Sequence, residues 1–316
     1  MDTTQHILIS IMFGFTVVFI FICVILCVRQ TIKNVIIRFA FPYKRALELY
    51  SAYQYRDETY IYTRGRTHFY IEIINDPNRD ENTETIVFCH GNGMTAKSLY
   101  EDWKHVTMDT NLNVILIEYP GYDEKKYSYL TESMIQESVW TSFESIMKEN
   151  KKTKVYLIGH SIGSGVASYL SWKNRSLPTP WKIQGLMMLS PFESILRTRT
   201  ENRWLWTLFS LVDAFPTWKY LDCYIGFLYV VYSETDEIIP SSHAKRFISK
   251  YGAPHSKFEG LHSGLTPNMT RIHVHKFLEK CRVSAESYNS IVIQDHTRKK
   301  SIVLVEYKLL EQEKEL

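Results

Sequence analysis

The 316-residue sequence predicts an α/β fold: a mostly parallel central sheet with helices on both faces, preceded by one N-terminal transmembrane helix. Three observations predict it. Short apolar runs rich in β-branched and aromatic residues alternate with longer stretches of helical spacing, which indicates strands joined by crossovers. One of these runs leads through a glycine-flanked serine into a helix. Near the N-terminus, an uncharged stretch is long enough to cross a bilayer.

The chain is expected to divide into six parts. An uncharged apolar run from Ile7 to Val28 has the length of a membrane-spanning helix, and the segment after it is rich in Lys and Arg. By the positive-inside rule, this basic flank places the body of the chain in the cytoplasm. The parts are a short N-terminal flank (1–6), a transmembrane anchor (7–28), a basic juxtamembrane connector (29–57), the α/β domain (58–281), a cap or lid insert within it (192–222, here the cap segment) and a C-terminal extension (282–316).

Two alternatives to this topology stay open. A cleaved signal peptide has a shorter apolar core and a positive amino-terminal region, whereas the flank here carries Asp2 and no Lys or Arg, which favours an uncleaved anchor. A lumenal body would allow glycosylation at the acceptor triplets of Asn174 and Asn268. Beside the basic flank, Cys27 is a candidate for S-palmitoylation, although an unmodified membrane-buried thiol is favoured.

Composition argues against several functional classes. The formal net charge of +3 is too small to indicate a nucleic-acid partner. The five cysteines are scattered and include no C-x-x-C pair, so neither a disulfide framework nor a zinc site is expected. We expect no metal and no organic cofactor.

Strands and helices follow one another along the α/β domain. Before the serine motif we expect a hairpin at 59–63 and 68–74, strands at 85–89 and 114–118, and a helix at about 131–149. After it we expect strands at 185–189, 226–232 and 256–259 and helices at 241–251 and 267–281. Within the cap segment, Trp204, Leu208, Leu211 and Phe215 share one face of a predicted helix, which either packs over the sheet or contacts the membrane as a lid.

The pattern Gly159-His160-Ser161-Ile162-Gly163 is a G-x-S-x-G motif between a buried strand and a small-residue helix. This context is typical of a nucleophile elbow, in which the serine occupies a strained strand-to-helix turn. The flanking glycines are needed because a Cβ atom there would collide with a neighbouring strand or helix. Ser161 is therefore the candidate nucleophile.

A serine hydroxyl needs a base to take its proton and a carboxylate to orient that base. Asp236 follows the strand at 226–232, and His262 follows the strand at 256–259, so acid and base come in the order that this architecture requires. Glu234 and Glu237 stay open as alternative acids. His243 and His255 are expected to be surface residues, and His160 a structural neighbour of the turn.

The remaining candidates concern the oxyanion hole and the substrate pocket. The N–H of Ile162, directly after the nucleophile, and that of Asn92, in the loop His90-Gly91-Asn92-Gly93, are the expected oxyanion donors, with Gly93 in reserve. Candidate pocket residues are Gly93, Tyr119, Trp204 and Phe209.

Five short motifs together resemble those of the α/β-hydrolase superfamily. They are His90-Gly91-Asn92, Tyr119-Pro120-Gly121-Tyr122, Gly159-His160-Ser161-Ile162-Gly163, Thr235-Asp236-Glu237-Ile238-Ile239-Pro240 and Gly260-Leu261-His262. The set is most similar to the membrane-associated alpha/beta-hydrolase domain-containing proteins thirteen and seventeen. Two departures concern the pocket: Asp123 stands where relatives often have Gly, and Leu261 precedes the histidine where they tend to have Gly.

The resemblance implies an α/β-hydrolase fold over about residues 58–281 and a serine hydrolase that acts on acyl esters or thioesters. Because residues 7–28 would hold the domain at a membrane, lipids or acylated proteins are the expected substrates. A serine peptidase of the same fold is the alternative enzyme. A catalytically silent α/β-hydrolase fold that serves as a membrane-bound interaction protein is the alternative from another class.

Overall fold

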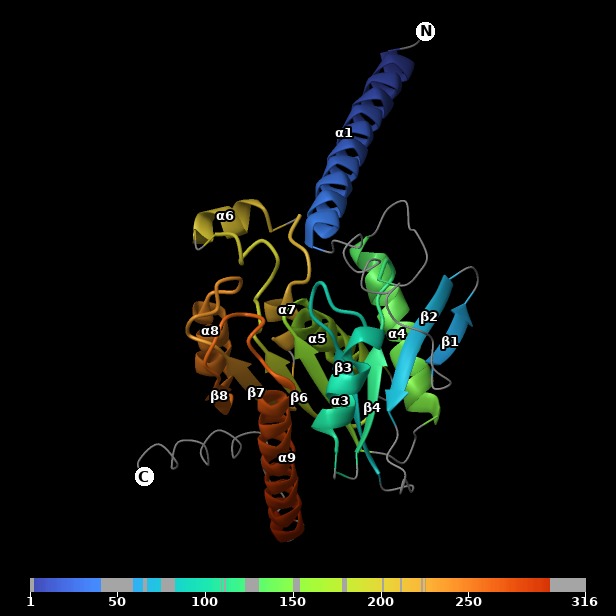
Figure 1. The fold of residues 1–316 in the computed structure, drawn as a ribbon. Coiled ribbons are helices and arrows are strands. Elements are labelled where there is room, and N and C mark those ends of the chain that lie inside the picture. The colour runs from blue at the N-terminus through green and yellow to red at the C-terminus, as the bar shows by residue number, and fades with distance from the viewer. Residues whose placement is uncertain are drawn as a thin grey trace.

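The structure is a computed structural model that describes residues 3–40, 59–64, 67–74, 83–108, 110, 112–122, 131–149, 154–177, 181–200, 202–210, 212–222, 224 and 226–295. Its centre is a sheet of eight strands in the order β1-β2-β4-β3-β5-β6-β7-β8 (Figure 1). The strands are β1 (Thr59–Arg64), β2 (Thr67–Ile74), β3 (Glu84–Cys89), β4 (Leu112–Ile117), β5 (Val155–His160), β6 (Ile183–Leu189), β7 (Phe227–Tyr232) and β8 (His255–Lys257).

Six neighbouring strands, from β4 to β8, are parallel, while β1 and β2 pair antiparallel at one edge. The mostly parallel sheet predicted from the sequence is therefore confirmed. Parallel strands all end at the same edge of the sheet, so the loops that follow β3, β4, β5, β7 and β8 meet there. This carboxyl-terminal edge brings together the motifs that lie far apart in the sequence.

The helices are α1 (Thr3–Ala40), α3 (Tyr100–Val106), α4 (Glu132–Glu149), α5 (Ile162–Arg175), α6 (Arg203–Leu208), α7 (Thr217–Leu221), α8 (Ser241–Tyr251) and α9 (Pro267–Asp295), with a 3₁₀ turn at Lys97–Leu99. Helix α3 was not predicted, because its seven residues are too short for a clear helical period. The last helix was expected to end at Cys281, whereas α9 continues to Asp295 through a stretch without Gly or Pro.

Two apolar cores lie on the two faces of the sheet. Along β3, Val87 and Cys89 belong to the core beneath α4, α5 and α8, whereas Ile86 and Phe88 belong to the core beneath α3 and α9. This alternation follows the two-residue period of a strand. Because both faces are covered, every residue of β3, β4 and β5 is buried, and the sheet forms a rigid support for the loops at its edge.

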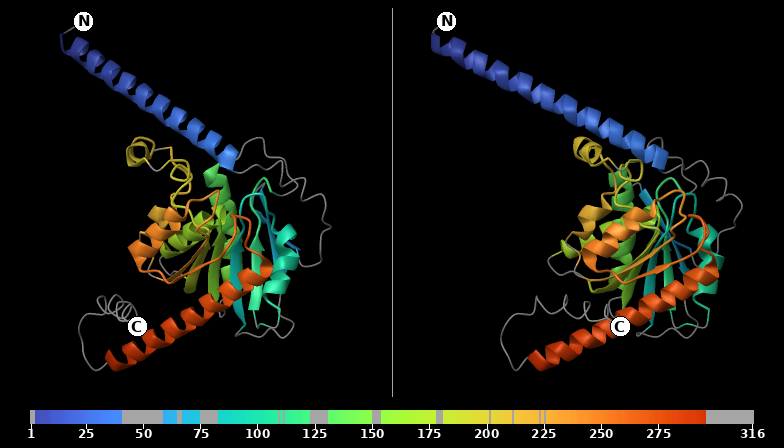
Figure 2. Two further views of the ribbon diagram at one scale, coloured as in Figure 1. Left: turned by 60° about the vertical axis from the view of Figure 1, so that its left-hand side comes forward. Right: turned by 90° about the vertical axis from the view of Figure 1, so that its left-hand side faces the viewer.

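Helix α1 extends away from the domain, and its carboxyl end packs against it (Figures 1 and 2). The helix contains an apolar span, Met12–Ile37, with a mean hydropathy of 2.6, long enough to cross a membrane. At its domain end, Ile37 is fully buried in the core, and Lys33 forms an ion pair with Glu132 of α4. The helix thus continues past Val28 into the segment assigned to the connector, and ends at Ala40, ahead of Pro42.

The cap segment differs from its prediction. We expected Trp204 and Phe215 on one face of a single helix, and this was wrong, since α6 ends at Leu208. Phe215 lies beyond it, with a positive φ of 48° and a fully buried side chain, whereas the Trp204 side chain is 76% exposed. Apolar spacing alone did not show where the helix ends, because Ser210 and Asp213 also suit a helical surface.

Candidate active site

Ser161 lies in the turn between β5 and α5, at the carboxyl-terminal edge of the sheet. Its backbone has φ 53° and ψ −121°, a conformation that L-residues rarely adopt. A Cβ atom at Gly163 would collide with the carbonyl groups of Cys89 and His90, and one at Gly159 with the backbone of Gly163. The glycines of the G-x-S-x-G motif are thus required by close backbone approach, which holds Ser161 in its strained turn.

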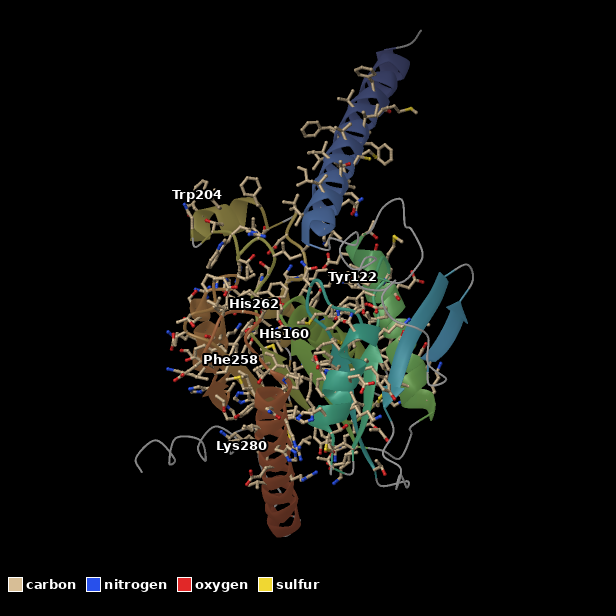
Figure 3. The ribbon with its side chains drawn as sticks, in the orientation of Figure 1. Tyr122, His160, Trp204, Phe258, His262 and Lys280 are labelled. Carbon is tan, nitrogen blue, oxygen red and sulfur yellow. The ribbon has the colours of Figure 1, made fainter. Side chains whose placement is uncertain are left out.

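Three side chains from separate loops form a continuous hydrogen-bonded chain. The His262 ring places Nε2 2.9 Å from Ser161 Oγ, and its Nδ1 lies 2.8 Å from Asp236 Oδ2 and 3.0 Å from Asp236 Oδ1. With the proton on Nδ1, the ring donates to Asp236, and Nε2 is left to accept the Ser161 hydroxyl proton. Figure 3 shows His262 at the edge of the sheet below α6.

Asp236 is held for this contact by its own backbone turn. The N–H groups of Ile238 and Ile239 donate to Asp236 Oδ1 at 3.0 and 2.7 Å. Burial alone would raise the pKa of the Asp236 carboxyl, but the hydrogen bond to His262 and the two backbone N–H groups outweigh it and hold the pKa below its usual value. Asp236 therefore remains an anion beside His262 at neutral pH.

The other two candidate acids have different positions. Glu237 Oε2 accepts a hydrogen bond from the backbone N–H of His262 at 2.7 Å, so it contacts the main chain of this residue. Glu234 is exposed and pairs with Lys245 and Lys257 at 2.6 and 2.9 Å. Among the three carboxylates, the structure brings only Asp236 to the His262 imidazole.

The loop after β3 lies directly against Ser161. A Cβ atom at Gly91 would be 2.7 Å from His160 Nδ1 and 3.5 Å from Ser161 Cβ, so only glycine allows this approach. Asn92 is oriented by the Tyr122 hydroxyl, which donates to Asn92 Oδ1 at 2.6 Å. The backbone N–H groups of Asn92 and Ile162 have no hydrogen-bond partner among the described residues.

A buried pair supports this loop from below, and the sequence analysis did not identify it. His90 Nε2 lies 2.8 Å from Glu118 Oε1, and both side chains are almost fully buried. The other Glu118 oxygen accepts from the N–H of Ala96 at 2.8 Å, and the Tyr119 hydroxyl donates to the carbonyl of His90 at 2.9 Å. A lone Glu at the end of an apolar strand was the available signal, because a buried carboxylate needs a partner.

Two other histidines are buried near the site. His160 stacks on His262 with ring centroids 5.5 Å apart, and burial, reinforced by His262, lowers the pKa of His160 to about 3, so its ring is neutral (Figure 3). His243 was expected at the surface, and this was wrong: it is fully buried on α8, with Nδ1 3.2 Å from Glu193 Oε2. Its side chain falls on the inward face of an amphipathic helix.

The predicted pocket residues lie in three separate parts of the fold: the loop after β3, the end of β4 and the cap segment. Tyr119 is only 1% exposed and supports the loop after β3 through His90. Trp204 and Phe209 are exposed, in and just after α6, and no contact among the described residues joins either one to Ser161. Gly93 has φ 75° in the oxyanion-side loop. Their role as pocket residues stays a prediction.

The described residues contain no group of three or more His, Cys, Asp or Glu that could hold a metal ion.

Comparison with known proteins agrees with this fold. The family model for the alpha/beta hydrolase fold matches residues 84–215. Among solved structures, Est1E from Butyrivibrio proteoclasticus superposes with a TM-score of 0.55 at 16% identity, covering 72% of this chain and 100% of Est1E. XC6422 from Xanthomonas campestris, a serine hydrolase without a lid, gives 0.52 at 11% identity, with 72% and 97% covered. The Pyrococcus furiosus esterase PF2001 gives 0.52 at 14% identity, with 72% and 92% covered.

The chain therefore has the α/β-hydrolase fold. Among curated proteins, it is 22% identical over 163 residues to the alpha/beta hydrolase-like protein L404 of Acanthamoeba polyphaga mimivirus. That match covers 51% of this chain and 58% of the viral protein, so the chain spans little more than half of the relative's length.

Proposed function

We propose that this chain is a membrane-anchored serine hydrolase that cleaves acyl ester or thioester bonds of lipids or lipidated proteins. The observation that carries the proposal is the hydrogen-bonded chain from Ser161 through His262 to Asp236, built on a strained elbow. An activated serine needs each of these parts: a hydroxyl, a base within hydrogen-bond reach and an anion that fixes the tautomer of the base.

The reaction would proceed through an acyl-enzyme. Ser161 Oγ attacks the carbonyl carbon of the ester or thioester while its proton passes to His262 Nε2. The bond to the leaving alcohol or thiol then breaks, and His262 gives this group its proton. Water attacks the acyl-enzyme in the same way, with His262 again as base, and releases the carboxylic acid and the free serine. Asp236 stabilises the imidazolium that forms in each half.

The negative charge that develops on the carbonyl oxygen would be bound by the N–H groups of Ile162 and Asn92. Ile162 opens α5, where the helix dipole and the first unpaired N–H groups favour an anion. The Gly93 N–H instead faces the Tyr122 hydroxyl. Burial and the nearby Glu118 raise the pKa of this hydroxyl, and the Gly93 N–H partly opposes them. This supports Asn92 over Gly93 as the second donor.

The structure of α1 supports an uncleaved anchor over a cleaved signal peptide. Removal of the helix would expose the core that Ile37 helps to fill and would leave buried Glu132 without its partner Lys33. The basic residues around Lys33 favour a cytoplasmic domain by the positive-inside rule. Anchoring at a membrane favours lipid or acylated-protein substrates over the peptides of a serine peptidase.

Labelling with a fluorophosphonate probe tests the proposal on the full chain in detergent or lipid vesicles. We expect labelling of the wild type, none of Ser161→Ala, and unchanged labelling of Ser176→Ala, a control at the opposite end of α5. A panel of esters and thioesters then gives the acyl length. A folded wild type that is not labelled in either medium would leave the catalytically silent interaction protein as the better interpretation.

A further inference from the structure

Helix α6 and the turn after it carry apolar side chains that face solvent. Trp204 is 76% exposed, Leu205 36% and Phe209 44%. An exposed tryptophan surrounded by other large apolar residues is unusual for a soluble surface and is typical of a site that contacts another apolar body. Outside α1, Trp204 is the most exposed large apolar residue among those that the structure describes.

The position of α6 indicates that this apolar partner is a membrane. The three ribbon views agree that α6 lies at the same end of the molecule as the carboxyl end of α1, at the edge where the parallel strands end (Figures 1 and 2). The Trp204 side chain lies on the outer side of α6, away from the sheet (Figure 3). An apolar helix that leaves the domain at this end would bring the bilayer surface to the same level as α6.

One carboxylate joins the base of α1 to the cap segment. Glu132 pairs with Lys33 of α1 through Oε2, and its Oε1 accepts from the backbone N–H of Phe215 at 2.8 Å. Glu132 is buried, so these contacts are not loosened by solvent. The place where α1 leaves the domain is thereby fixed relative to the cap segment.

The inner side of α6 is fixed as well. The Arg197 guanidinium carbon lies 4.6 Å from the centroid of the Trp206 ring and 4.4 Å from that of the Trp218 ring. Trp206 Nε1 donates to the carbonyl of Thr200 at 2.7 Å, and Arg197 pairs with Glu193 at 3.1 Å. Trp206 thus holds α6 to the domain, which leaves Trp204, two residues away, directed outward.

We propose that α6 is a second membrane contact: Trp204, Leu205 and Phe209 insert into the interface of the leaflet that α1 enters. Tryptophan is suited to this region because its ring is apolar while its N–H remains hydrogen-bonded. With α1 and α6 both in the membrane, the edge that carries Ser161 faces the bilayer, and an acyl chain reaches the serine from the lipid side. This inference rests on the proposed anchor and names where the proposed substrate enters.

Quenching of tryptophan fluorescence by brominated lipids tests the contact without any activity. None of the seven tryptophans lies in α1, so quenching of the full chain in phosphatidylcholine vesicles reports the domain alone. We expect lipids brominated near the interface to quench the wild type, and Trp204→Phe to lose most of that quenching. Trp172→Phe is the matched control, because Trp172 is also exposed (40%) but lies near the far end of α5. Equal quenching of both variants, or none of the wild type, would overturn the proposal and favour a protein partner for α6.

A second measurement connects the contact to the substrate. Replacing Trp204, Leu205 and Phe209 by serine should lower hydrolysis of a long-chain ester embedded in vesicles about fivefold relative to a short water-soluble ester. An equal effect on both esters would contradict entry from the bilayer. If the wild type hydrolyses neither ester, the proposed function fails, whereas the quenching result still decides whether α6 contacts lipid.

Discussion

The elbow and the cap segment lie at the same end of the sheet and are built in opposite ways. From Val155 to Ser171, through β5, Ser161 and most of α5, every residue is buried, and the glycines leave no room for a Cβ atom. In the cap segment, α6 has six residues and holds to the domain mainly through Trp206, while its Trp204 and Leu205 side chains are exposed.

This difference shows where the constraint on each segment comes from. Contacts within the chain fix the conformation of the elbow. Almost any substitution there therefore disturbs a backbone that has no space to move. Contacts within the chain determine only the inner side of α6, and the outer side is free to suit a partner outside the protein. Substitutions in the elbow should therefore have large effects on the isolated protein, and substitutions in the cap small ones.

The largest effect is expected at the carboxylate behind His262. Asp236→Asn keeps the shape of the side chain but removes the charge and favours the wrong His262 tautomer, which should lower kcat by about 10⁴-fold. Hydrolysis of a soluble ester by purified protein measures this. Glu237→Gln is the matched control, since Glu237 accepts from the His262 backbone N–H and not from its ring, and a loss below about tenfold is expected. Similar losses in the two variants would mean that the acid has been misassigned.

The next effect tests the close packing of the elbow. Gly163→Ala places a Cβ atom against the Cys89 carbonyl, which belongs to a buried strand and has little room to shift. We expect destabilisation of about 3 kcal/mol, measured by thermal unfolding in detergent micelles, together with lost fluorophosphonate labelling. Gly14→Ala, where α1 offers nothing within 4 Å of the new atom, should leave both unchanged. A stable, labelled Gly163→Ala would show that the elbow can relax.

The comparison also explains how much could be predicted from the sequence. The order of the strands and the positions of Ser161, Asp236 and His262 followed from local patterns, because a strained turn needs its glycines and each loop begins where a strand ends. The sequence predicts that the three residues lie near one another at the same edge of the sheet, but it does not predict the distances between their atoms.

What the sequence did not predict depends on contacts between distant segments. The pair of His90 and Glu118 supports the oxyanion-side loop, but 28 residues separate the partners, and Glu118 lies outside the five motifs. His243 is buried because Glu193, 50 residues away, occupies the space beside it. The end of α6 was missed because apolar spacing does not show where a helix stops when the residues that follow also suit a helical surface.

A pH-dependent effect sharpens the contrast, since it depends on burial of His160. The pKa of this ring is lowered to about 3, so between pH 6.5 and pH 3 the unfolded chain binds a proton that the folded chain does not. Because this proton uptake favours the unfolded chain, the free energy of unfolding is highest above pH 6.5. It decreases as the pH falls, by roughly 1.4 kcal/mol per pH unit. Thermal unfolding at pH 6.5 and pH 5 should show a steeper loss for the wild type than for His160→Gln. Asp236 remains ionised throughout this range, so equal slopes would place the His160 ring in a wetter environment.

The smallest effect is expected in the cap. Arg197→Met keeps the apolar stem but removes the cation between Trp206 and Trp218 and the ion pair with Glu193, for a local loss of about 1 kcal/mol. Hydrogen exchange should therefore become faster at 203–208 while α5 stays protected. Lys219→Met is the control, because Lys219 is exposed and its Nζ lies 5.7 Å from the Trp218 ring centroid. Faster exchange in α5 as well would mean that the cap and the elbow form one cooperative unit.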